Sequence, residues 1–290
     1  MTHVRRAVLL AGLAAAVVAM PAAAHPGSGI VADGRGQIYF IDTGAGVWKL
    51  DAKGALTRLP GPAFHWMTID LDNRFRKARL PSGPDGEIAR VGSKPALFVA
   101  SDFPLAVAGD GNLYYPSRTR AGGVDLFVTT PAGATSVVAR IPLPYLNGLA
   151  AAPGGSLYAT GNDSIWKIDA QRRVSRVIGG VTLAGCASYP GIVASDGPLL
   201  RGLDVDAQGN LVVAATGCGR VLKIAPDGKI ATVIQTESPW SPTAVVHAGG
   251  DLYVLEYLHT ATEDRQAWRP RVRKVSADGK SVVLATVERR

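Results

Sequence analysis

A short pattern of hydrophobic and polar positions recurs six times along the chain. Each copy has a turn residue, usually Gly, then a polar or charged residue, and then two positions that are hydrophobic or nearly so. The copies begin 37, 38, 44, 54 and 41 residues apart. They are Gly36-Gln37-Ile38-Tyr39, Asn73-Arg74-Phe75-Arg76, Gly111-Asn112-Leu113-Tyr114, Gly155-Ser156-Leu157-Tyr158, Gly209-Asn210-Leu211-Val212 and Gly250-Asp251-Leu252-Tyr253. A repeat of this length is typical of a β-propeller, in which each copy folds as a blade of about four short strands.

The first copy shows the expected strands most clearly. Its short apolar segments, separated by turn residues, lie at 29–32, 38–41, 47–50 and 55–58. Turns that contain Gly follow the third strand at 51–54 and recur at 226–228 and 277–279. Hairpin turns often need a residue with a positive φ, and Gly adopts one without steric cost. A blade cannot bury both of its faces alone, so the copies must stack around a ring.

We therefore predict an all-β fold, a six-bladed β-propeller of four-stranded blades. The second copy, from about Trp66 to Val99, is the weakest, and a seven-bladed ring is the nearest alternative.

The start of the chain does not follow the repeat. Arg5-Arg6 precedes an apolar run from Ala7 to Met20, and Pro21-Ala22-Ala23-Ala24 follows. A positive start, a short apolar run and small residues are typical of a cleavable secretory signal. We predict a signal peptide over 1–24, a single propeller domain over 25–290, and export to the periplasm or the extracellular space. No later apolar run approaches 18 residues, so no transmembrane anchor is expected after cleavage.

Charge adds little to this picture. The formal net charge is +8, and removing the two signal arginines leaves +6. The basic residues are densest at 74–77 and 269–274, where solvated strand faces explain them and a patch for anionic polymers or lipid headgroups is the alternative. We expect a monomer that binds a small molecule or a protein, and no nucleic acid.

The chain has two cysteines, Cys186 and Cys218. An even pair in an oxidising compartment usually forms a bridge, so we predict a disulfide between them. A catalytic thiol is the alternative, but no His lies near either cysteine in the sequence.

Residues 147–150, Asn-Gly-Leu-Ala, and 202–211 resemble the strand openings of NHL-repeat proteins and of the gluconolactonase/regucalcin-like six-bladed propellers. The resemblance extends as a repeat pattern over the whole mature chain. The resemblance implies the fold. It does not imply one activity, because this architecture hosts lactonases, lyases, amidating enzymes and pure binding modules.

The gluconolactonase-like resemblance also implies one divalent metal ion. It would be held by a Glu from the first blade, an Asn that opens a middle blade and an Asp that opens a later one. Asn147 matches the Asn, but Arg201 stands where the Asp is expected, and the first blade offers His25 or Ser28 instead of Glu. A guanidinium repels a metal ion, so the family's chemistry is in question here. The alternative for Asn147 is a structural role in an Asn-Gly turn.

Propeller geometry indicates where a ligand would bind. The loops that lead into the first strands and the loops between second and third strands open on one face, which we call the pore-mouth face. The candidate ligand-binding residues that we assign to it are Asp42, Trp66, Asn147, Arg201 and Tyr257.

Three histidines, His25, His65 and His259, map to the same face, and neutral imidazoles suit zinc, copper or iron. NHL-type amidating lyases, as the resemblance implies, also use central histidines for a metal. The three are therefore our candidate metal ligands, although isolated hydrogen-bonding histidines are the alternative. His247 is expected to be structural.

Glu256 and His259 end a strongly apolar strand and are the candidate catalytic pair, since a carboxylate and an imidazole can perform general acid/base chemistry. The alternative for Glu256 is an ion pair with the charged loop that contains Glu263, Asp264, Arg265 and Arg269.

The sequence leaves two classes of function open. It contains no Walker A motif, no G-x-S-x-G elbow, no H-E-x-x-H and no C-x-x-C. An exported propeller that binds a small ligand or a protein partner is favoured, because the lactonase ligand set is incomplete. A metal-assisted hydrolase or lyase that uses the same face is the alternative.

Overall fold

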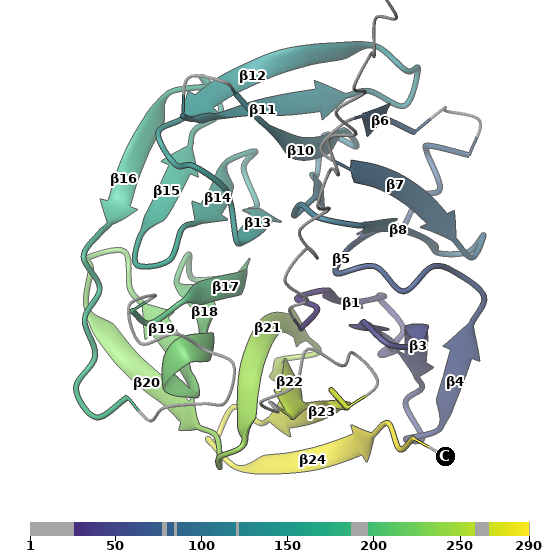
Figure 1. The fold of residues 1–290 in the computed structure, drawn as a ribbon, viewed down its shortest axis with the longest axis vertical. Helices are drawn as coiled ribbons and strands as arrows, with labels where there is room; N and C mark the ends of the chain where they lie inside the picture. The colour runs from purple at the N-terminus through teal and green to yellow at the C-terminus, as the bar shows by residue number, and fades with distance from the viewer. Residues whose placement is uncertain are drawn as a thin grey trace, which may run out of the picture.

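The computed structural model describes residues 26–76, 80–83, 86–119, 122–186, 197–258 and 267–289. Within these ranges the strands form six four-stranded antiparallel sheets arranged as a ring, and there is no α-helix (Figure 1). The prediction of an all-β, six-bladed propeller is confirmed, and the ring has six blades instead of seven. The predicted signal peptide, His25 and His259 lie outside the described residues. No helix of the described part is long and apolar enough to cross a membrane.

The first three blades comprise the strands β1 Ile30–Ala32, β2 Ile38–Asp42, β3 Gly46–Leu50 and β4 Leu56–Leu59; β5 Trp66–Asp70, β6 Ser82–Gly83, β7 Gly86–Val91 and β8 Ala96–Ala100; and β9 Ala106–Val107, β10 Leu113–Arg118, β11 Val124–Thr129 and β12 Thr135–Ile141. The turn from β3 to β4 contains Gly54 at φ 87°, as expected from the sequence.

The other three blades comprise β13 Gly148–Ala151, β14 Leu157–Thr160, β15 Ile165–Ile168 and β16 Val174–Ile178; β17 Leu200–Val205, β18 Leu211–Ala215, β19 Arg220–Ile224 and β20 Ile230–Gln235; and β21 Trp240–Ala248, β22 Asp251–Leu258, β23 Pro270–Val275 and β24 Ser281–Thr286. Gly228 at φ 85° and Gly279 at φ 82° make the outer hairpins of the last two blades.

The second blade departs from the sequence prediction. Its strand order is β5-β8-β7-β6, so β8 occupies the place next to the inner strand that the second strand has elsewhere. The copy that begins at Asn73 is a turn, with Asn73 at φ 52°, and is not the start of a strand. Its apolar residue, Phe75, is fully buried and packs edge-on against Phe98 of β8, with ring centroids 5.5 Å apart. The hydrophobic position was identified correctly, but it fills the core from a turn.

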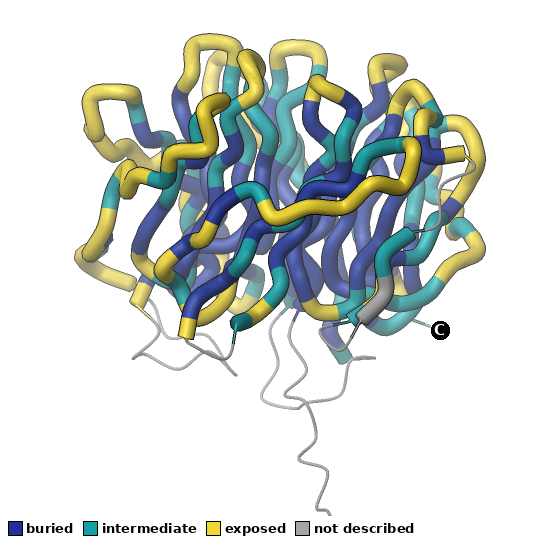
Figure 2. The backbone as a smooth tube through the Cα atoms, turned by 90° about the horizontal axis from the view of Figure 1, so that it is seen from above, coloured by how far each residue is buried: buried dark blue, intermediate teal, exposed yellow. Residues whose placement is uncertain are grey.

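The core lies between the blades. Six clusters of buried side chains each join one blade to the next, because alternate side chains of a strand point to opposite faces of its sheet. In β22, Val254 packs towards the fifth blade and Leu255 towards the first. Figure 2 shows the result: buried strands through the body of the ring, and exposed hairpin tips along its upper edge.

Each blade is built from one continuous segment, so the ring is closed by side chains. Tyr257 of the last blade is fully buried and donates a hydrogen bond to the carbonyl oxygen of Ile41 in the first, at 2.7 Å. Arg289 follows β24 and forms a two-pronged ion pair with Asp42, with N to O distances of 2.5 and 2.6 Å. These contacts join the two ends of the chain.

Candidate functional site

A narrow channel lies along the axis of the ring. Residues of all six innermost strands line it, and its volume is about 160 Å³. That is room for a few water molecules, whereas a drug-sized ligand needs about 300 Å³ or more. A ligand of that size does not fit inside the channel and would have to bind at its mouth.

Glycines bring the inner strands close together beside this mouth. A Cβ atom on Gly148 would lie 2.4 Å from the backbone oxygen of Arg201, and one on Gly202 would lie 2.5 Å from the Cβ of Ala244. Gly148 and Gly202 line the channel, and Asn147 and Arg201 immediately precede them in the chain.

Arg201 reaches across the mouth of the channel. It belongs to β17 of the fifth blade, and its guanidinium lies 5.8 Å from the ring centroid of Trp66 in β5 of the second blade. These two blades face one another across the ring (Figure 1). Both side chains are buried, with 6% and 5% exposed.

Burial lowers the pKa of Arg201 to about 10, and the nearby hydroxyl of Tyr257 opposes this shift. At neutral pH the protonated form is still favoured about a thousandfold, since each pKa unit is a factor of ten. The centre of the pore-mouth face therefore contains a buried positive charge beside an indole ring.

His65 lies just before β5 and is also buried. Its Nδ1 lies 2.6 Å from the carbonyl oxygen of Ser101 and 3.8 Å from a carboxylate oxygen of the exposed Asp102. Since a carbonyl can only accept, Nδ1 carries the proton, and in the neutral ring Nε2 carries the lone pair. The tautomer of His65 is thus set by the backbone.

Asn147 is oriented from within its own blade. Its Nδ2 donates to Oδ1 of Asn162 at 2.8 Å, and the hydroxyl of Tyr145 donates to the same oxygen at 3.2 Å. The backbone nitrogen of Asn147 donates to the carbonyl oxygen of Thr160. Sequence reasoning missed Tyr145, whose signal was an aromatic residue two positions before the Asn-Gly turn.

The two buried acids at the ends of second strands are held by arginines. Asp42 is bound by Arg289, as described above. Glu256 is fully buried, and its oxygens accept from Nε of Arg271 at 2.5 Å and of Arg273 at 2.6 Å. Glu256 and Tyr257 alternate in β22, so Tyr257 faces the first blade and Glu256 the fifth.

The ion pair that we gave as the alternative role of Glu256 is therefore present, but with other partners than the charged loop. Glu263, Asp264 and Arg265 lie outside the described residues, and Arg269 pairs with Glu288 at 2.7 Å. The partners come from β23, the next strand, where they lie opposite β22.

The described residues do not fit a divalent metal ion. No three His, Cys, Asp or Glu side chains come together in the described ranges. Asp42 and Glu256 accept from arginines, and Arg201 places a cation at the position where the resemblance implies an Asp. Of the three candidate metal-binding histidines, His65 alone belongs to the described part. His247 pairs with Asp204, Nδ1 to Oδ2 at 3.0 Å, as expected of a structural residue.

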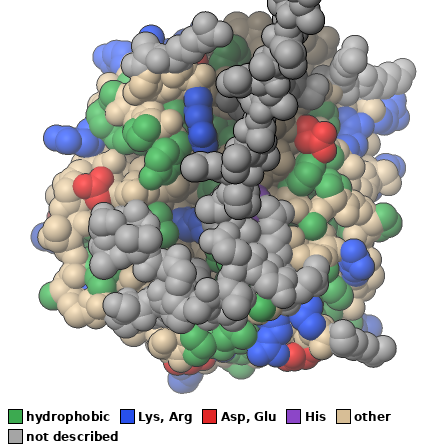
Figure 3. All heavy atoms as spheres, viewed as in Figure 1, with side chains coloured by type: hydrophobic (Ala, Val, Ile, Leu, Met, Phe, Trp, Pro, Cys, Tyr) green, Lys and Arg blue, Asp and Glu red, His purple; other side chains and the backbone are tan. Residues whose placement is uncertain are grey.

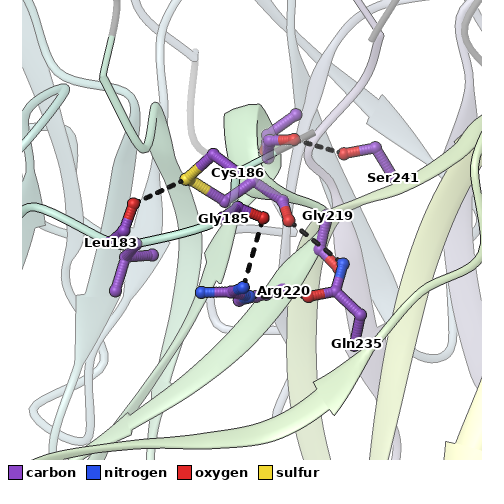
Figure 4. The surroundings of a disulfide bond; sticks show 9 residues. Leu183, Gly185, Cys186, Gly219, Arg220, Gln235 and Ser241 are labelled. Atoms are coloured by element: carbon purple, nitrogen blue, oxygen red, sulfur yellow. Dashed lines mark hydrogen bonds between the residues drawn. A yellow bond between two sulfur atoms is a disulfide. The ribbon is translucent and has the colours of Figure 1, made fainter. Parts of the chain in front are cut away.

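The predicted disulfide is present and joins Cys186 to Cys218 (Figure 4). Cys218 is fully buried and ends a short 3₁₀ turn, Thr216–Cys218, between β18 and β19. Arg220 donates to the carbonyl oxygen of Gly185 at 3.4 Å and to Gln235 at 2.6 Å. The bridge therefore ties the segment before residue 187 to the pore-mouth end of the fifth blade.

Figure 3 views the ring from the same side as Figure 1. Among the residues that the structure describes, basic and acidic side chains are scattered around its rim.

Comparisons with known proteins agree with this architecture. A family model described as the SMP-30/gluconolactonase/LRE-like region matches residues 106–261, just over half of the chain. No curated protein matches the sequence.

Among solved structures, a luciferin-regenerating enzyme has a TM-score of 0.56 at 15% identity, covering 87% of this chain and 91% of that one. A protein provisionally named a gluconolactonase has a TM-score of 0.52 at 18% identity, covering 78% and 84%. The calcium-binding protein regucalcin from Agrobacterium tumefaciens has a TM-score of 0.47 at 16% identity, covering 90% and 73%. The first two likenesses show the fold, and the family match shows the relationship. The chain belongs to the SMP-30/gluconolactonase/LRE-like family.

Proposed function

We propose that this protein is an exported propeller that binds a small polar ligand at its pore-mouth face, with no metal ion required. The observation that carries the proposal is the arrangement around the channel mouth. The guanidinium of Arg201 lies 5.8 Å from the ring of Trp66 in the opposite blade, His65 immediately precedes Trp66 in the chain, and Asn147 precedes the inner strand of the blade next to that of Arg201. Such a set offers a cation, an aromatic face, an imidazole and an amide to one ligand.

The acids support binding over hydrolysis. A carboxylate whose oxygens already accept hydrogen bonds from arginine side chains is poorly placed to take a proton from a ligand as a general base. This applies to both Asp42 and Glu256. The Cys186–Cys218 disulfide supports export, because disulfides persist mainly in oxidising compartments.

A hydrolase or lyase at the same face is the second candidate. One observation favours it: the backbone carbonyl of Ser101 holds His65 in the tautomer whose Nε2 can accept a proton. This candidate would be supported if the protein turns over a compound that it binds, and if His65→Gln abolishes that turnover but still binds the compound.

The proposal is tested by titration calorimetry on the exported protein with a set of small hydroxylated acids, amides and lactones. We expect a ligand whose affinity falls about tenfold or more in Trp66→Phe and Asn147→Ala, since each removes a contact to the ligand. Trp166→Phe, on the third strand of the fourth blade, is the matched control and should leave the affinity unchanged. Equal affinity in all four proteins would contradict binding at this face. Retention of residues 1–24 on protein found in the cytoplasm would contradict export.

A further inference from the structure

Three neutral side chains of the fourth blade and its entry segment, Tyr145, Asn147 and Asn162, form one hydrogen-bonded group beside the channel. We propose that this group recognises a carboxamide of the ligand: Asn162 donates to the carboxamide oxygen, and Asn147 accepts from the carboxamide nitrogen. This inference rests on the proposed function and names its ligand class.

The first step is the hydrogen-bonding capacity that the group leaves unused. An Asn side chain has an oxygen that accepts and a nitrogen that donates. Oδ1 of Asn162 accepts from Nδ2 of Asn147 at 2.8 Å and from the hydroxyl of Tyr145 at 3.2 Å. Within the described part of the chain, Oδ1 of Asn147 and Nδ2 of Asn162 form no hydrogen bond. One acceptor and one donor therefore remain for a ligand.

The second step is burial. Asn147 is only 8% exposed, and a buried acceptor without a partner costs free energy that a ligand N–H would recover. Asn162 is half-buried and Tyr145 is 40% exposed, so the group is open to solvent on one side. The phenol ring of Tyr145 adds an aromatic surface next to the two amides.

The third step is rigidity. The backbone nitrogen of Asn147 donates to the carbonyl oxygen of Thr160 at 2.8 Å, and the carbonyl oxygen of Asn162 accepts from the backbone nitrogen of Leu200 at 2.8 Å. Both residues are therefore held by backbone and side chain before a ligand arrives, which reduces the entropy lost on binding. A fixed acceptor beside a fixed donor fits a carboxamide, which carries a donor and an acceptor in one plane. A carboxylate only accepts, and an amidinium only donates.

The experiment compares three probes of one shape by titration calorimetry. Benzamide has a donor and an acceptor, benzoate has two acceptors, and benzamidinium has two donors. We expect the wild-type protein to bind benzamide about tenfold more tightly than either of the others, because each of them leaves one polar atom of the site unsatisfied.

Asn162→Asp is the decisive variant. It keeps the oxygen that Asn147 and Tyr145 bind, and it replaces the free nitrogen with a second acceptor. The order of affinities should therefore reverse, with benzamidinium bound about tenfold more tightly than benzamide. Gln171→Glu makes the same change from amide to acid at an exposed residue between β15 and β16, and should keep the wild-type order.

The outcomes separate the two proposals. Equal binding of the three probes, tighter binding of benzoate or benzamidinium by the wild type, or an order that Asn162→Asp leaves unchanged would each overturn the carboxamide assignment and leave ligand binding standing. Failure of all three probes when a compound of the wider set binds would do the same. Failure of every probe and of the wider set would overturn both proposals.

A second variant covers the case in which Asn162→Asp does not fold. Tyr145→Phe keeps the exposed ring and removes the hydroxyl that donates to Asn162, so the amide of Asn162 is less firmly oriented. A reduced preference for benzamide is expected from it, and an unchanged preference contradicts the proposal.

Discussion

Replacing both Cys186 and Cys218 with alanine should lower the free energy of unfolding by about 4 kcal/mol. The bridge joins residues 32 positions apart. For a loop of that size the entropy that a cross-link removes from the unfolded chain is about 12 cal/mol/K, which is about 4 kcal/mol at 25 °C. Alanine is preferred to serine at position 218, because Cys218 is fully buried and a hydroxyl there would need a partner.

The assay is denaturant unfolding of the exported protein, the double variant and the wild type after reduction. Both forms without the disulfide should unfold at a lower denaturant concentration. The dependence of their unfolding free energy on denaturant should be somewhat steeper, because the unfolded chain without the cross-link exposes more surface. At about 2 °C per kcal/mol for a chain of this size, the melting temperature should fall by about 8 °C. A loss below about 1 kcal/mol in both forms would refute the loop-closure argument.

Three further predictions concern the buried charges and the closure of the ring. Arg289→Gln should cost about 3 kcal/mol of unfolding free energy, since it leaves the buried carboxylate of Asp42 without its guanidinium, and a denaturant midpoint equal to that of the wild type would contradict this. Burial raises the pKa of Tyr257, so the neutral phenol stabilises the fold below the unfolded pKa of about 10, and stability should fall by about 1.4 kcal/mol per pH unit above it. Tyr257→Phe should make that alkaline slope shallower without abolishing it, because the pKa values of Tyr39 and Tyr114 are raised as well, and an unchanged slope would contradict a contribution from Tyr257. Glu256→Gln should lower stability by about 3 kcal/mol and leave ligand binding within twofold, because the carboxylate faces Arg271 and the fifth blade; a binding defect at unchanged stability would restore it as a candidate site residue.

Much of the fold follows from local features of the sequence. The spacing of the copies predicts the blades, and the outer hairpins follow from glycines such as Gly54 and Gly228, which supply the positive φ that these turns need. The disulfide could also be predicted, because a chain with two cysteines allows one pairing. The strand order of the second blade could not be predicted from the sequence. An apolar residue such as Phe75 is compatible with a strand or with a turn, and its packing against Phe98 decides between them.

The candidate site divides in the same way. Asn147 and Arg201 could be placed at the pore mouth from the sequence alone, since each precedes a glycine at the start of an inner strand, and that position depends on the repeat. Tertiary structure decided what each side chain meets. Arg201 reaches Trp66 across the ring, and Asp42 binds Arg289 from 247 residues away. No local pattern encodes such partners, because strand period and turn chemistry determine which face a side chain occupies, whereas closure of the ring determines what lies opposite it.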